Sequence, residues 1–283
     1  MPSFLRPGSY KSSPVFNRPL DTERSYCLSR AFHLVLLTLL TLLSMSVVGL
    51  KALTLAFIED NTDRGFSFLI PNGTSTTTTT LAALPRQLHT APAKLALVAG
   101  VVATIVGLTH TAFIIWDWRT GKRTQSYVFR RNAMFLHFCN SIMILFSLVS
   151  IFGTHRSTSH FKEKHVMQQA YRFASPSSRF FRNNDDEIRY NIGTFDLETW
   201  SCELKSVEGA RSVWSEYEKQ CGVEMAGRVM VIPFMITAFL IVGACVVEMM
   251  RCRRDADGRR MKTEEVGVEL GKLENRTGVY NAL

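Results

Sequence analysis

Four long apolar segments constrain this chain more than any other feature. They cover residues 31–57, 95–116, 133–153 and 229–250. A helix needs roughly 20 apolar residues to cross a bilayer core about 30 Å thick, and each segment reaches that length. Over all 283 residues the chain is 46% hydrophobic and 20% charged, but the charges are concentrated between the segments. The sequence therefore predicts an all-α fold, a membrane four-helix (tetraspan) bundle.

The positions of Lys and Arg predict the orientation of this bundle. Residues 1–30, 117–132 and 251–283 hold 18 Lys and Arg in 79 residues, whereas residues 58–94 and 154–228 hold 14 in 112. Cationic segments next to a membrane span tend to stay cytoplasmic. Both termini are therefore predicted to be cytoplasmic, in the plasma membrane or a secretory-pathway membrane. Residues 58–94 and 154–228 are then two outer loops.

The net charge of +9 belongs mostly to these cytoplasmic segments. Their expected partner is the anionic inner leaflet of the membrane, which attracts basic segments next to membrane spans. Nucleic acid is not expected as a partner, because no nucleic-acid-binding motif is present. Residues 1–30, with four prolines among Ser and Arg, are predicted to be disordered. Trp116 and Trp118 precede a link that is predicted to bind lipid headgroups. Its basic residues are Arg119, Lys122, Arg123, Arg130 and Arg131.

Short motifs predict modifications on each side of the membrane. Asn72-Gly73-Thr74 is an N-glycosylation sequon in the first outer loop. The threonine run 76–80 that follows is interpreted as an O-glycosylated or simply solvated spacer. Cys27 and Cys252 lie next to the first and last spans, where cysteines can be palmitoylated.

Polar residues within the spans suggest two further features. His110 and His137 lie near the cytoplasmic ends of antiparallel helices, so with Asn140 they are expected to form a polar layer. The layer is either a proton-sensitive or substrate-contacting site or a set of hydrogen bonds that hold helices together. The second is favoured because no carboxylate lies in the middle of a span. Lys51, near the end of the first span, is expected to reach the headgroups.

Small residues recur along one face of the second span, which predicts close packing against another helix. They are Ala96, Gly100, Ala103 and Gly107.

The first half of the large outer loop carries no clear site, and no fold is predicted for residues 154–194. His155, His160 and His165 are five residues apart and would not share a helix face. The acidic run 183–187 lacks the ligand pattern of a calcium loop. Both groups are interpreted as solvated surface, and no metal site or cofactor is predicted.

The second half of this loop has a helical pattern. Leu197, Trp200 and Leu204 repeat at helical spacing behind Asp196, which can cap the helix. A second helix is predicted from Val213 onward, without a break into the last span. Cys202 and Cys221 are the only cysteines on the predicted outer side, where oxidising conditions favour a disulfide. That bond would bring together a small aromatic core. Its expected members are Trp200, Trp214 and Tyr217.

Two charged residues of the second helix are also predicted to interact. Glu224 precedes Arg228 by four residues, the favourable order for an ion pair along one helix.

The end of the chain resembles a pattern in uncharacterised four-span membrane proteins of filamentous fungi. The matching residues are Phe195, Glu198, Trp200, Cys202, Leu204, Cys221, Glu224, Arg228 and Pro233. This resemblance implies a membrane location and a cysteine-bearing last outer loop. The layout is also similar to that of tetraspanins. The Cys-Cys-Gly motif of tetraspanins and the claudin placement of a Trp and Cys pair in the first loop are both missing.

Three functional hypotheses follow. The favoured one is a non-enzymatic membrane organiser or adaptor whose large outer loop meets a protein partner. The second is a subunit of an oligomeric transporter or channel, lined by the layer of His110 and His137, so a homo-oligomer stays open. The third is a membrane enzyme, for which the chain offers no recognised catalytic motif and no catalytic residue.

Overall fold

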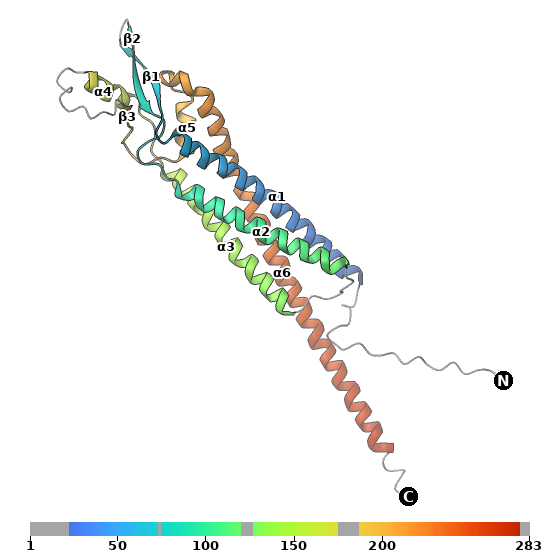
Figure 1. Cartoon of the computed structure of the whole chain (residues 1–283). Coiled ribbons are helices and arrows are strands. Elements are labelled where there is room, and N and C mark those ends of the chain that lie inside the picture. Colours follow the sequence, from blue (N-terminus) through green and yellow to red (C-terminus); the bar gives the residue numbers. More distant parts are fainter. Residues whose placement is uncertain (1–22, 73–74, 120–126, 175–186, 278–283) are drawn as a thin grey trace.

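Four long helices form most of the computed structural model of this chain (Figure 1). The structure describes residues 23–72, 75–119, 127–174 and 187–277, with side chains within 28–70, 78–119, 128–170 and 188–250. The helices are α1 (Glu23–Asn61), α2 (Ala91–Arg119), α3 (Tyr127–Ser157) and α6 (Trp214–Thr277). Each contains an apolar stretch long enough to cross a membrane, and each predicted span lies within one of them.

The outward faces of these helices are apolar. Only 33–39% of the residues in their most apolar windows are buried inside the protein. Large side chains such as Val35 and Phe146, each 64% exposed, point away from the bundle. Such a surface is stable in lipid, where every backbone polar group of a helix is satisfied within the helix. The chain is therefore an integral membrane protein with several spans, and the predicted all-α four-helix fold is confirmed.

The four helices pack as a closed ring. α1 packs against α2 and α6, and α3 packs against the same two helices. Leucine, isoleucine, alanine and phenylalanine side chains fill the centre of the ring. Its fully buried members include Leu37, Leu40, Ala99, Ala103, Ile144, Phe234 and Ile241.

The small residues of α2 allow α1 to approach closely. A Cβ atom added at Gly100 would lie 2.8 Å from Cγ2 of Val48, and one at Gly107 would lie 2.7 Å from Oγ1 of Thr41. Between these points the hydroxyls of Ser44 and Thr104 are 2.8 Å apart and share a hydrogen bond. The glycines thus serve helix packing, as the spacing of small residues predicts.

Replacing Gly100 by valine is expected to destabilise the bundle by about 1–3 kcal/mol, the usual cost of overpacking. Gly49→Val is the matched control, because Gly49 is also helical but its added Cβ would have no atom within 4 Å. Chemical denaturation of both variants in mixed micelles measures the difference. Equal stability of the two variants would contradict the packing role of Gly100.

A folded region, which we call the head, caps one end of the bundle (Figure 1). It consists of β1 (Gly65–Asn72), β2 (Ser75–Ala82), α4 (Glu163–Ala174), β3 (Glu187–Ile188), α5 (Leu197–Leu204) and the 3-10 helix η3 (Glu208–Val213). The strands form a sheet in the order β1-β2-β3, antiparallel and then parallel. The head thus combines both predicted outer loops into one unit.

The threonine run 76–80 of the first predicted outer loop is not a spacer, because it lies in β2 and pairs with residues 67–71 of β1. Phe66, Phe68 and Ile70 alternate along β1 and are at most 7% exposed, so one face of the hairpin is buried. Such alternation is typical of a strand with one buried face, because successive side chains of a strand point to opposite sides.

The head has a hydrophobic core of its own, centred on Trp200. The Trp200 ring makes edge contacts with three aromatic rings of the head, those of Phe161, Tyr190 and Phe195. Its Nε1 donates a hydrogen bond of 2.9 Å to the Ala83 carbonyl, which also accepts one from the Tyr217 hydroxyl. The predicted aromatic core is therefore present but larger, and Trp214 lies only half-buried at its margin.

The start of α5 and the path of α6 agree with the sequence. Asp196 caps α5 by accepting a hydrogen bond from the Thr199 backbone amide. α6 continues without interruption from the head through the bundle. The predicted disulfide between Cys202 and Cys221 is confirmed and links α5 to α6, with Cα atoms 4.9 Å apart.

Candidate functional site

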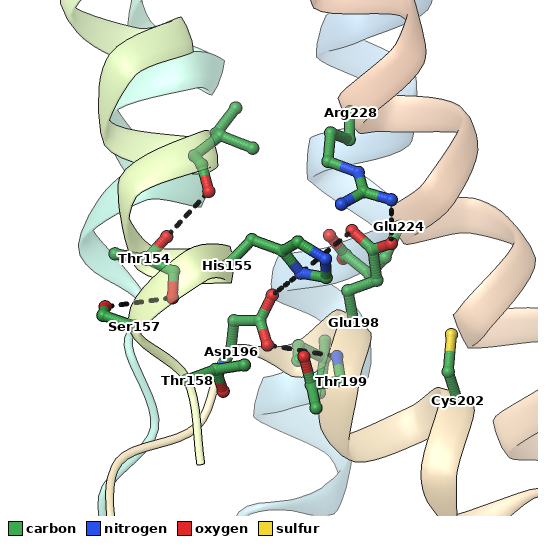
Figure 2. A network of polar contacts seen from close by, with 12 residues as sticks. Thr154, His155, Ser157, Thr158, Asp196, Glu198, Thr199, Cys202, Glu224 and Arg228 are labelled. Atoms are coloured by element: carbon green, nitrogen blue, oxygen red, sulfur yellow. Dashed lines mark hydrogen bonds and ion pairs between the residues drawn. The ribbon is translucent and has the colours of Figure 1, made fainter. Parts of the chain in front are cut away.

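Polar side chains connect the head to the bundle, and we call them the junction network; Figure 2 shows the part of it around His155. It lies where α1, α3 and α6 meet the start of α5. Its members are Lys51, Thr54, His155, Asp196, Glu198, Gln220, Glu224 and Arg228.

The most buried part of the junction network is an ion pair between α1 and α6. Nζ of Lys51 lies 2.7 Å from Oε2 of Glu224, and the two residues are 3% and 7% exposed. The other carboxylate oxygen of Glu224 accepts hydrogen bonds from the Thr54 hydroxyl and from Nε2 of Gln220. The expectation that Lys51 reaches the headgroups is therefore wrong, because a buried carboxylate binds its ammonium group instead.

A second ion pair joins α6 to α5. The guanidinium of Arg228 lies 2.9 Å from Oε1 of Glu198 and also lies over the Phe152 ring, 5.9 Å from its centroid. The predicted pair between Glu224 and Arg228 along α6 is therefore wrong. Each residue pairs with a different helix, since the docking of α1 and α5 offers closer partners than the next turn of α6.

His155, at the end of α3, is the third part of the junction network. Figure 2 shows its ring between Asp196 and Glu198. Nδ1 of His155 is 2.9 Å from Oδ2 of Asp196 and 3.8 Å from Oε2 of Glu198. The prediction of solvated surface is therefore wrong for His155. It holds for His160, whose side chain is 80% exposed, whereas His165 is half-buried against the Tyr190 ring.

The two carboxyl groups beside His155 differ in acidity. Burial favours the neutral form of Asp196, but hydrogen bonds from Thr199 and His155 outweigh it and lower its pKa. Burial raises the pKa of Glu198, although Arg228 and His155 oppose this effect. Asp196 is thus the more firmly anionic of the two.

A small cavity adjoins the junction network. Its volume of about 40 Å³ exceeds the roughly 10–15 Å³ that one water molecule needs. Asp196, Glu198 and Glu224 contribute three carboxyl groups to its wall, and Lys51 contributes a cation. The cavity therefore offers polar, water-accessible space between the head and the bundle.

A second polar group lies at the end of the bundle remote from the head. Nδ1 of His110 is 2.8 Å from Nε2 of His137, so the two predicted histidines are in contact. The ring of His33 lies 6.5 Å from that of His110, and its Nδ1 is 3.2 Å from a Glu248 carboxylate oxygen. We call His33, His110, His137 and Glu248 the histidine layer.

His33 and Glu248 were missed by the sequence reasoning, although both lie near those ends of their spans that the sequence predicts to be cytoplasmic. The depth argument that connects His110 with His137 would also have found them. Asn140 is 2% exposed, and neither polar atom of its amide has a hydrogen-bond partner among the described residues. Asn140 is therefore buried but not hydrogen-bonded to the histidine layer.

The remaining predicted sites lie at the limits of the described residues. Asn72 ends β1, while its side chain and the rest of its sequon lie outside the described part. Cys27 in α1 and Cys252 in α6 also have side chains outside it, as do residues 120–126 of the basic link and the acidic run 183–187.

No protein-family model, curated protein or solved structure matches this chain. The resemblance to fungal four-span proteins stays a prediction, and the functional proposals below depend on the geometry of the head, the junction network and the histidine layer.

Proposed function

We propose that this integral membrane protein is a non-enzymatic organiser or adaptor, whose head binds a partner protein. One observation carries the proposal. The head folds around its own hydrophobic core and is fixed to the bundle by a disulfide and by the ion pair between Glu198 and Arg228.

A fixed head suits protein binding for an energetic reason. A loop that becomes ordered only on binding loses conformational entropy, and this loss reduces affinity. In the head, β1, β2 and α5 already pack around Trp200, so most of that ordering has taken place during folding. The head therefore presents its surface in a constant orientation to the membrane.

The proposed orientation places the head on the outer side and both termini in the cytoplasm, in the plasma membrane or a secretory-pathway membrane. The charge distribution supports it, and a disulfide in the head is consistent with an oxidising compartment. At the opposite end, Trp116 and Trp118 are 66% and 52% exposed, which suits aromatic residues at a headgroup layer. The basic link next to them is proposed to bind anionic lipids.

Proximity labelling from the head tests this proposal. The full chain is compared with a Cys202→Ser, Cys221→Ser double variant, at matched amounts of membrane-inserted protein. We expect specific partners to be labelled by the unchanged chain and lost in the double variant, because loosening α5 from α6 disturbs the head. Cys139→Ser is the control, since Cys139 is a free, exposed cysteine of α3.

An unchanged partner set in the double variant would contradict the proposal, provided that limited proteolysis shows its head to be loosened. Labelling from the head and from the C-terminus should also reach different compartments. Labelling of the same compartment from both points would contradict the proposed orientation.

The histidine layer supports a second candidate function, a proton-linked transporter or channel. Ionisable residues within membrane spans often mark proton or substrate paths, and His33, His110, His137 and Glu248 contribute four of them from four helices. Flux through the purified chain in proteoliposomes tests this candidate. It should fall strongly in His110→Ala and His137→Ala, and an absence of flux for protons and cations would exclude it.

A further inference from the structure

We propose that His155, Asp196 and Glu198 form a binding site for a divalent transition-metal ion, with Zn²⁺ as the best fit. One ligand atom from each residue, Nδ1 of the imidazole and one oxygen of each carboxylate, lies within 4.8 Å of the other two. The three residues come from two separate elements, the end of α3 and the beginning of α5. The proposal is independent of the partner-binding role of the head.

The hydrogen bonds around the site leave the required atoms available. Asp196 accepts the Thr199 backbone amide with Oδ1 and turns Oδ2 toward His155. Glu198 binds the Arg228 guanidinium with Oε1, and its Oε2 is the oxygen nearest to His155. Each carboxylate is thus held by one oxygen and presents the other. Such outer partners orient the ligands in protein metal sites.

The surrounding backbone fixes the position of Asp196 further. Its amide donates a hydrogen bond of 3.0 Å to the hydroxyl of Thr158, three residues after His155. Asp196 is also the cap of α5, so its side chain cannot turn away without loss of that cap. The ligand atoms lie within 4.8 Å of one another, whereas ligands of a tetrahedral Zn²⁺ are about 3.4 Å apart, so the side chains close in around the ion by about 1 Å.

The mixture of ligands favours Zn²⁺ over Ca²⁺ or Mg²⁺. Zn²⁺ binds imidazole nitrogen and carboxylate oxygen at about 2.0–2.2 Å and often keeps one position for water. Ca²⁺ prefers six to eight oxygen ligands. The adjoining cavity, lined by Asp196 and Glu198, provides space for a water ligand. Two carboxylates against the single cation Arg228 leave the site with a net negative charge.

Binding moves a proton within His155. In the contact with Asp196 the carboxylate accepts, so Nδ1 of His155 carries the hydrogen. Zn²⁺ takes the place of this hydrogen, and the proton that Nδ1 loses goes to Nε2, so that the ring binds the metal as neutral imidazole. A bound ion would then join α3 to α5, beside the ion pair that joins α6 to α5.

Zinc binding to the purified full chain in lipid nanodiscs tests the proposal, with a chromophoric chelator as competitor. We expect one Zn²⁺ per chain and a higher unfolding temperature than in EDTA. His155→Gln should weaken Zn²⁺ binding by about 100-fold. The loss of a residue that only orients a metal ligand already weakens metal binding by about 10–100-fold, and His155 is itself a proposed ligand. His160→Gln is the matched control, because His160 also contacts a carboxylate, that of Glu203, but is exposed and has no second acidic neighbour in contact among the described residues.

Three results would overturn the proposal. They are an absence of Zn²⁺ binding by the unchanged chain, equal affinity of the chain and His155→Gln, and equal binding of Ca²⁺ and Zn²⁺. Should His155→Gln lower the unfolding temperature in EDTA, Glu198→Gln decides the matter. This variant keeps the size of Glu198 and a hydrogen bond to Arg228, and it should also lose Zn²⁺ binding.

Discussion

Replacing Lys51 by methionine is expected to destabilise the folded chain by about 3–5 kcal/mol, the cost of leaving one member of a buried ion pair without its partner. Methionine keeps most of the volume of lysine, so the loss reports the charge. The Glu224 carboxylate would remain at 7% exposure, with only the Thr54 hydroxyl and the Gln220 amide to stabilise it. Equilibrium unfolding in mixed micelles, followed by tryptophan fluorescence, measures the loss.

A double variant separates the charge from the packing. Lys51→Met with Glu224→Gln leaves no charge at this point and should recover most of the lost stability, because a neutral pair of similar volume often replaces a buried ion pair at little cost. His160→Gln, at an exposed ion pair, should change stability by no more than about 0.5 kcal/mol. A loss below about 1 kcal/mol in Lys51→Met would contradict the expected cost of leaving the buried Glu224 carboxylate without its partner.

Replacing Trp200 by alanine should open the head, with a loss of about 3–5 kcal/mol. Trp200 is fully buried and contacts the rings of Phe161, Tyr190 and Phe195. Alanine would leave a cavity between these rings and would remove the hydrogen bond to Ala83. Amide hydrogen exchange along β1 and β2 measures the free energy of opening. Protection of these strands should fall, while that of α2 and α3 should remain.

Two milder changes identify the cause of this effect. Trp200→Phe keeps a ring in the core, and the Ala83 carbonyl still accepts the Tyr217 hydroxyl, so the loss should be clearly smaller. Trp214→Ala removes a half-buried indole at the margin of the same core and should also cost less. Equal protection of β1 and β2 in Trp200→Ala and the unchanged chain would refute a Trp200-centred head.

Features that depend on residues close together in the sequence were predictable. The four spans follow from the length of their apolar runs, and the α5 cap follows from Asp196 directly before Leu197. The disulfide followed from assigning Cys202 and Cys221 to one side of the membrane by charge alone. In each case the determining residues are near one another, or share a constraint that the membrane imposes on the whole chain.

The junction network could not be predicted in the same way. Lys51 and Glu224 are 173 residues apart, so no spacing rule connects them. The four-residue spacing within one helix favoured an ion pair between Glu224 and Arg228. Instead, Glu224 pairs with Lys51 of α1, and Arg228 pairs with Glu198 of α5. His155 was interpreted as solvated surface because its five-residue spacing from the next histidine does not give a shared helix face, whereas its acidic partners, Asp196 and Glu198, come from the beginning of α5. The alternation of Phe66, Phe68 and Ile70 does indicate a strand with one buried face.

The unbroken course of α6 has a mechanical consequence. This helix begins at Trp214 in the head and ends at Thr277, and its 64 residues span about 96 Å at 1.5 Å per residue. The disulfide at Cys221 and the ion pair at Arg228 attach α5 to α6 within the first 15 residues of this helix. The head and the segment beyond the bundle thus belong to one helix (Figure 1), and Pro233 is the point within the bundle where a proline weakens its backbone hydrogen bonding.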